Sequence, residues 1–157
     1  MQKICPQSAR VHRVLSHSYS VYLVALIVGV VVDTFFKMRF SFDFYSEIGF
    51  LIIFAGTLLV YWAQNTSSAS KKESINKNTS RDFARGPYKF TRNPTHAGLM
   101  FMMFGFGIIA GSFTIIILTL VAFTVSKLIF LPQEEKLLVA KYGSEYLEYQ
   151  KKVNPWI

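Results

Sequence analysis

A polar run at the start of a hydrophobic stretch is the first candidate for a chemical site. It lies within the segment GPYKFTRNPTHAG, residues 86–98. Asn93 is a favoured N-cap residue and Pro94 suits the first position of a helix, so a helix should begin here with His96 in its first turn. The free N–H groups and positive dipole of a helix N-terminus disfavour a cation such as Arg92 unless an anion is also present. A bound anion is therefore one interpretation of this segment.

The other interpretation of the segment needs no ligand. Lys89 and Arg92 would contact lipid phosphates at the membrane surface. Tyr88 and Phe90 would belong to an aromatic belt, and His96 would be one more polar residue at the interface. From this segment alone both interpretations stay open.

Two adjacent carboxylates near the C-terminus are the second candidate. Glu134 and Glu135 follow Pro132, at the end of a hydrophobic segment. A tight turn between the last two hydrophobic segments should place them on the same cytoplasmic side as Arg92 and His96. They could equally form the acidic first turn of a new helix, which the helix dipole favours.

An aromatic pattern follows the two carboxylates. Leu138, Tyr142, Tyr146 and Tyr149 recur at spacings of four, four and three, which predicts an amphipathic helix interrupted at Gly143. Such a helix could lie on the membrane surface. It could also close a site over the two last hydrophobic segments.

The overall composition of the chain is typical of a membrane protein. Of the 157 residues, 52% are hydrophobic and 16% aromatic, which is more than an ordinary soluble domain carries. The net charge of +8 fits the concentration of Lys and Arg on the cytoplasmic side of membrane proteins, and no nucleic-acid-binding motif accompanies it. The single cysteine, Cys5, leaves no internal disulfide, CxxC motif or cysteine-based metal site. We expect one membrane-embedded domain over residues 1–157, with no metal and no nucleic-acid partner.

Four hydrophobic segments predict an all-α, polytopic fold with four transmembrane helices and the C-terminal amphipathic helix on the cytoplasmic side. The expected spans are residues 19–36, 48–63, 95–110 and 113–131. The second and third are short against the roughly 20 residues that a span requires, but their polar ends can sit at the interface. Gly111 and Ser112 leave almost no loop, so the last two spans should form a tight antiparallel hairpin.

The distribution of charge predicts the orientation of these spans. The N-terminal arm carries Lys3, Arg10 and Arg13, whereas the loop over residues 38–46 and its flanks is balanced in charge. The segment 65–94 has only Glu73 and Asp82 against its basic residues, which are Lys71, Lys72, Lys77, Arg81, Arg85, Lys89 and Arg92. By the positive-inside rule both regions should be cytoplasmic. An even number of spans then places both termini in the cytoplasm.

Together, GPYKFTRNPTHAG, the hairpin and EEKLLVAKYGSEYLEYQKKV resemble the isoprenylcysteine carboxyl methyltransferase and phospholipid methyltransferase superfamily of integral membrane enzymes. The resemblance covers about residues 85–155. The superfamily's motif is usually Arg-His-Pro-x-Tyr-x-Gly. Arg92, Pro94 and Gly98 match it, whereas Asn93 and His96 stand where His and Tyr are common.

The resemblance implies an enzyme that transfers a methyl group from S-adenosylmethionine, bound at the cytoplasmic end of the last spans, to a lipophilic acceptor. Arg92 and the helix N-terminus would lie near the cofactor's carboxylate and Glu135 near its amino or hydroxyl groups, while Gly98 would allow the backbone to approach closely. His96 would orient the cofactor or the acceptor, or act as a base for an acceptor that arrives protonated. The implied catalytic residues are Arg92, His96 and Glu135, and the implied cofactor-binding residues are Tyr88, Arg92, Asn93, Pro94, His96, Gly98, Leu99, Glu134, Glu135 and Tyr146.

The acceptor and two other classes of function stay open at this point. A prenylated thiol or carboxylate, a phospholipid amine and a small lipophile all fit as acceptors, with membrane lipids as the surrounding partners. Sterol-type membrane reductases show a similar C-terminal pattern, but they bind NADPH and normally have more spans. In a non-enzymatic assembly protein, the glycines, Asp33 and Lys127 would serve helix packing only. We expect Asp33 and Lys127 to lie near opposite membrane faces, each reaching its own interface.

Overall fold

The computed structural model describes residues 6–36, 40, 45–77 and 83–155, and gives only the backbone for residues 6–18 and 71–77. All regular secondary structure in this described part is helical, which confirms the predicted all-α class. Lys3, Cys5, Arg81, Asp82 and most of the loop 38–46 lie outside the described residues. The elements are α1 (Pro6–Phe36), α2 (Tyr45–Lys77), the 3₁₀ turn η1 (Gly86–Lys89), α3 (Pro94–Ile109), α4 (Phe113–Val125), the π-helical segment η2 (Ser126–Phe130), α5 (Leu131–Tyr142) and α6 (Ser144–Lys152).

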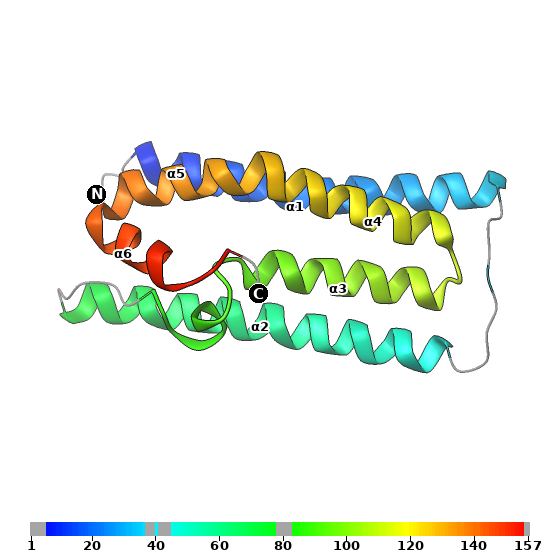
Figure 1. The fold of residues 1–157 in the computed structure, drawn as a ribbon, viewed down its shortest axis with the longest axis horizontal. Coiled ribbons are helices and arrows are strands. Elements are labelled where there is room, and N and C mark those ends of the chain that lie inside the picture. The colour runs from blue at the N-terminus through cyan, green and yellow to red at the C-terminus, as the bar shows by residue number, and fades with distance from the viewer. Residues whose placement is uncertain (1–5, 37–39, 41–44, 78–82, 156–157) are drawn as a thin grey trace.

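The helices form two packed pairs. α2 packs most extensively against α3, and α1 packs against α4, with the α3–α4 turn joining the two pairs (Figure 1). α6 lies at the end of the bundle where α3 begins, close to the chain between α2 and α3 (Figure 1). The arrangement therefore brings the beginning of α3, the α5 region and the C-terminal residues together at one end.

Within the described residues, three helical stretches are long and apolar enough to cross a membrane, namely Tyr19–Phe36, Tyr45–Ser70 and Phe113–Tyr142. Large apolar side chains such as Phe35 and Phe50 are exposed on them, as expected for helices that face lipid. The protein is thus a membrane protein. α3 is apolar but only 16 residues long. That α3 completes a fourth span stays a prediction.

Glycines set the close contact between α2 and α3. Gly49 and Gly56 of α2 face Gly105 and Gly98 of α3, respectively. A Cβ atom on Gly56 would lie 2.7 Å from the carbonyl oxygen of Gly98, and one on Gly105 would lie 2.7 Å from that of Gly49. Small residues at such positions let membrane helices approach backbone to backbone.

The predicted hairpin between α3 and α4 is confirmed. Gly111 adopts a positive φ of 60°, and the Ser112 Oγ accepts a hydrogen bond from the Ile115 N–H at 3.3 Å, which caps α4. The same hydroxyl donates a hydrogen bond to Asp33 Oδ1 at 2.9 Å. Asp33 is buried beside the turn between α3 and α4. That Asp33 lies near the membrane interface stays a prediction. A hydrogen-bonded site at the turn satisfies the Asp33 side chain inside the bundle.

Two helices extend beyond the expected spans. α2 continues to Lys77, past residue 63 where the expected span ends, since the polar residues after the apolar part can extend a helix that packing has already started. The helix that carries Glu134 and Glu135 is continuous with α4, because α4, η2 and α5 run on without a break. A proline has no N–H to donate, and its ring crowds the carbonyl group one turn earlier in a helix. The π-helical segment η2, which is wider than an α-helical turn, lies just before Pro132, at the position of that crowding.

Candidate functional site

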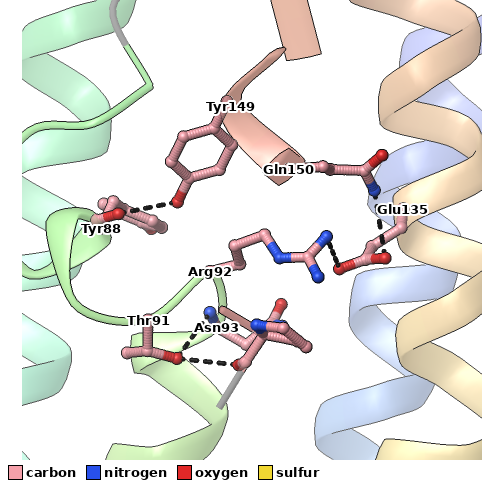
Figure 2. A network of polar contacts seen from close by, with 8 residues as sticks. Tyr88, Thr91, Arg92, Asn93, Glu135, Tyr149 and Gln150 are labelled. Carbon is pink, nitrogen blue, oxygen red and sulfur yellow. Dashed lines mark hydrogen bonds and ion pairs between the residues drawn. The ribbon is translucent and has the colours of Figure 1, made fainter. Parts of the chain in front are cut away.

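An aromatic cluster joins α6 to the chain that leads into α3. Tyr146 and Tyr149 are buried, and they pack with Val153 against Phe83, Ala84, Tyr88, Leu138, Val139 and Tyr142. The Tyr149 hydroxyl donates a hydrogen bond to the Tyr88 carbonyl oxygen at 2.8 Å (Figure 2). The chain changes direction between α5 and α6 at Gly143, whose φ is 61°. The predicted aromatic face therefore covers the segment before α3 and part of α5.

Burial has an electrostatic consequence for this cluster. It raises the pKa of the Tyr146 phenol and of the Tyr149 phenol well above the usual tyrosine range. For Tyr146, the nearby Glu135 carboxylate adds to the rise. Both phenols therefore stay neutral hydrogen-bond donors at physiological pH.

The C-terminal residues hold the backbone of the polar run in place. The Arg92 N–H donates to the Asn154 carbonyl oxygen at 3.3 Å, and the Thr91 hydroxyl donates to the Pro155 carbonyl oxygen at 2.9 Å. α3 begins at Pro94, as predicted, with Asn93 in the N-cap position. The Asn93 side chain makes no capping hydrogen bond, and its buried Nδ2 has no hydrogen-bond partner among the described residues.

Arg92 and Glu135 form an ion pair beside the start of α3. Arg92 Nη1 lies 2.8 Å from Glu135 Oε1, and the two side chains are 10% and 22% exposed (Figure 2). Gln150 of α6 donates through Nε2 to Glu135 Oε2 at 3.1 Å. The buried Arg92 Nε has no hydrogen-bond partner in the described part of the chain. A guanidinium and a carboxylate side by side can bind a ligand that carries both an acidic and an amino group.

Glu134 points to a different partner. Its Oε1 lies 3.5 Å from His96 Nε2, and both side chains are buried. Two rings of α1 flank the imidazole, with centroid distances to His96 of 5.6 Å for Tyr19 and 6.1 Å for Tyr22. The two adjacent carboxylates thus serve two separate polar groups.

The structure brings most of the predicted site residues together, but not all of them. Tyr88, Arg92, Asn93 and Glu135 lie beside α6, which carries Tyr146, and His96 and Glu134 pair next to α1 (Figure 2). Pro94 is fully buried at the first position of α3. Two further predicted residues make helix-packing contacts instead. Gly98 faces Gly56 and Val60 of α2. Leu99 packs against the buried cluster of Tyr22, Met103 and Ala122.

Several residues of this region were not predicted. Thr91, Gln150, Tyr19, Tyr22 and Ser126 all contribute to it. Gln150 directly follows the last residue of the aromatic pattern, which is a signal that could have found it. Tyr19 and Tyr22 share one helix face, but nothing in their spacing names His96 as the neighbour. In the described residues, no cluster of three or more His, Cys, Asp or Glu side chains could hold a metal ion.

The fold and site define a class, namely helical membrane proteins with a buried ion-pair site at one end of the bundle. The sequence profile of the phospholipid methyltransferase family matches residues 44–145, more than half of the chain, and the chain belongs to that family. This finding agrees with the resemblance found in the motifs, and it makes the protein a membrane methyltransferase by family. Methyltransferases of this family generally use S-adenosylmethionine. No curated protein matches the sequence significantly.

Proposed function

We propose that this protein transfers a methyl group from S-adenosylmethionine to a lipophilic acceptor at the membrane surface. The observation that carries the proposal is the ion pair of Arg92 and Glu135, both inside the region that the family profile matches, with Gln150 of α6 bonded to the carboxylate. An amino-acid moiety has one carboxylate and one ammonium group. Arg92 matches the first and Glu135 matches the second.

The residues present fit such a ligand. Buried polar atoms cost free energy when they lack partners, and Arg92 Nε and Asn93 Nδ2 are two donors of this kind beside the ion pair. A ligand carboxylate would accept from both. The aromatic cluster under α6 offers flat faces to a nucleobase or a sulfonium cation.

The chemistry asks little of the protein beyond binding and alignment. When bound, the sulfonium ligand supplies a methyl group that is open to direct displacement. Holding two reactants in line lowers the activation free energy of such a displacement substantially. No covalent protein nucleophile is therefore needed. α6 and the C-terminal residues would exclude water from the site.

The position of the site suits a lipophilic acceptor. The polar ligand would reach Arg92 from the aqueous side, whereas an acceptor would arrive from the lipid around the apolar helices. A phospholipid amine, an isoprenylcysteine-like carboxylate and a small lipophile are the acceptor classes to compare. The proposed topology has four spans with both termini in the cytoplasm.

Calorimetric titration of the purified protein in detergent tests this proposal. We expect saturable binding of S-adenosylmethionine and of its demethylated product, and none of NADPH. Binding of NADPH alone would replace the proposal with a reductase-like function. Binding of neither ligand by protein that is folded by circular dichroism would refute it in favour of an assembly role.

A further inference from the structure

A buried hydroxyl lies between the chain that carries Arg92 and the C-terminal end of the protein. Thr91 directly precedes Arg92 and is 4% exposed. Its hydroxyl donates a hydrogen bond to the Pro155 carbonyl oxygen at 2.9 Å and accepts one from the Asn93 N–H at 3.3 Å (Figure 2). One side chain therefore contacts both the C-terminal residues and the residue on the other side of Arg92.

The C-terminal residues reach Thr91 as an extended strap, a name used here for residues 153–155, which follow α6. Val153 has extended backbone angles, with φ −122° and ψ 129°, and it is buried in the aromatic cluster with Tyr146 and Tyr149. Its N–H donates to the Tyr149 carbonyl oxygen at 3.1 Å. The strap is therefore anchored at its first residue and runs from α6 to the start of α3 (Figure 1).

Two hydrogen bonds join the strap to the chain before α3. Besides the bond from Thr91, the Arg92 N–H donates to the Asn154 carbonyl oxygen at 3.3 Å. The Arg92 bond uses only main-chain atoms, which every residue except proline supplies in the same form. The Thr91 bond depends on a side-chain hydroxyl. The residue type at position 91 therefore decides whether this second bond to the strap forms.

The Thr91 hydroxyl has no proton left for a ligand. A threonine hydroxyl carries one O–H to donate, and Thr91 donates it to Pro155. The side chain is also almost completely buried. Direct binding of a cofactor by Thr91 therefore does not fit these contacts. What the hydroxyl does is fix the backbone on both sides of Arg92.

The backbone at Arg92 decides where its guanidinium lies. Arg92 Nη1 meets Glu135 Oε1 at 2.8 Å from the end of a long side chain, so a small backbone rotation moves the guanidinium by a larger distance. The Asn93 side chain makes no capping hydrogen bond that would hold the backbone from the α3 side. The Thr91 hydroxyl instead binds the Asn93 N–H. Precise placement of a binding group requires this kind of support from neighbouring hydrogen bonds.

We propose that Thr91 is a positioning residue that couples the C-terminal strap to Arg92. With the strap bound, the backbone is held so that the guanidinium lies beside Glu135. When the strap leaves, the Thr91 hydroxyl and the Arg92 N–H lose their partners together, and the guanidinium is no longer held. The inference rests on the proposed function, because it describes how the same site is kept ready for the amino-acid part of S-adenosylmethionine.

The first test measures this coupling without any ligand. Amide hydrogen exchange of Arg92 is followed by NMR in detergent, because that N–H donates to the strap. Thr91→Val replaces the hydroxyl with a methyl group of similar size, and we expect it to speed the exchange about tenfold, as the loss of a buried hydrogen bond should. Thr91→Ser keeps the hydroxyl and should stay within about threefold of the wild type. Unchanged exchange in Thr91→Val would overturn the inference.

Thr124→Val is the matched control for the same chemical change. The Thr124 hydroxyl also donates to a carbonyl oxygen, that of Leu120 at 2.8 Å, but it is exposed on α4. We expect this variant to change neither the exchange of the Arg92 amide nor the affinity for S-adenosylmethionine. Equal effects of Thr91→Val and Thr124→Val would show that the loss of any hydroxyl loosens the fold, and the inference would fail.

The second test is calorimetric titration of the same variants with S-adenosylmethionine. When a ligand binds only one conformation, its apparent Kd is the intrinsic Kd divided by the fraction of molecules in that conformation. If Thr91→Val lowers the fraction with Arg92 in place to about a tenth, Kd rises about tenfold. Thr91→Ser should restore the affinity, which a role of the side-chain volume alone would not explain.

A double-mutant cycle shows whether the effect of Thr91 passes through the strap. Pro155→Gly keeps the carbonyl group but frees a residue whose φ the proline ring fixes, and it should raise Kd about two- to fivefold. Its effect should be smaller in the Thr91→Val background, because the bond that it weakens is already absent there. Equal effects in the two backgrounds would show that Thr91 acts independently of the strap and would overturn the inference.

Pro155→Gly also decides the question if Thr91→Val does not fold, which circular dichroism would show. In that case, faster exchange of the Arg92 amide together with a higher Kd in Pro155→Gly supports the inference. An unchanged exchange rate and an unchanged Kd would refute it.

The affinity of the wild type for S-adenosylmethionine separates this inference from the proposed function. If the wild type binds S-adenosylmethionine and folded Thr91→Val binds it equally tightly, the inference fails and the proposed function stands. If the folded wild type does not bind it, the proposed function fails, and the positioning role of Thr91 fails with it.

Discussion

Replacing Arg92 with alanine should weaken S-adenosylmethionine binding more than any other single loss of a positive charge. Arg92 is the cation of the site, 10% exposed and 2.8 Å from Glu135, and its Nε lacks a hydrogen-bond partner among the described residues. A charge-assisted hydrogen bond is worth about 1.5 to 3 kcal/mol. Its loss therefore corresponds to a roughly tenfold to more than hundredfold increase in Kd.

The matched controls come from the same parts of the chain. Lys89→Ala removes an exposed cation from the same segment, and Glu148→Gln removes an exposed carboxylate from α6. Both should leave Kd within about threefold, because exposed charges contribute little. Glu135→Gln should resemble Arg92→Ala, since it removes the other half of the pair.

The assay is calorimetric titration of each variant, with folding checked by circular dichroism. An equal loss of affinity in Lys89→Ala and Arg92→Ala would show that general electrostatics governs binding. The assignment of the site to the Arg92–Glu135 pair would then be wrong.

Three further predictions concern the covering of the site by α6, the membrane topology and the buried phenol of Tyr149. A chain truncated after Lys141 should keep its membrane helices but lose cofactor binding, whereas a helix that merely lies on the membrane predicts normal titrations of the truncated protein. Cysteines introduced at Ser68 and Lys151 should be labelled from one side of the membrane and a cysteine at Ser41 from the other; labelling of Ser41 and Ser68 from one face would refute the topology. Because burial raises the Tyr149 pKa, that phenol stabilises the fold fully below its unfolded value of 10.0, and the stabilisation falls as pH rises toward the folded value. Thermal melts from about pH 8 to 11 should show this alkaline loss, reduced in Tyr149→Phe; an unchanged slope in that variant would assign the loss to another group.

Local signals predicted the start of α3 and the turn before α4. Asn93 and Pro94 specify a helix start from their own backbone preferences, and Gly111 with Ser112 specifies a tight turn. These features depend on a few adjacent residues. The structure therefore has them where the sequence indicates.

The partners of the two carboxylates could not be predicted in the same way. Adjacent residues on a helix point roughly 100° apart, so Glu134 and Glu135 were bound to diverge. Which of them meets Arg92 and which meets His96 depends on how α5 is rotated, and the π-helical turn at η2 changes that rotation. Nothing in the residue pattern predicts a π-helical turn.

The contribution of α1 was beyond prediction for a related reason. Tyr22 lies far from His96 in the sequence, and their contact depends on the packing of α1 against the rest of the bundle. The burial of Asp33 has the same origin, since its hydrogen-bond partner Ser112 belongs to the α3–α4 turn. Contacts between helices distant in the sequence are fixed by packing, which the pattern of one helix does not contain.

The glycine contacts between α2 and α3 have a mechanical consequence. Because Gly49 and Gly56 of α2 touch the backbone of Gly105 and Gly98 at two levels, neither helix can slide or rotate against the other without a collision. We therefore expect α2 and α3 to move together, so that a displacement that uncovers Arg92 would come from α6 and the C-terminal residues. Spin labels on the lipid-facing sides of α2 and α3 would keep a constant separation through a catalytic cycle, whereas a label on α6 would move relative to both.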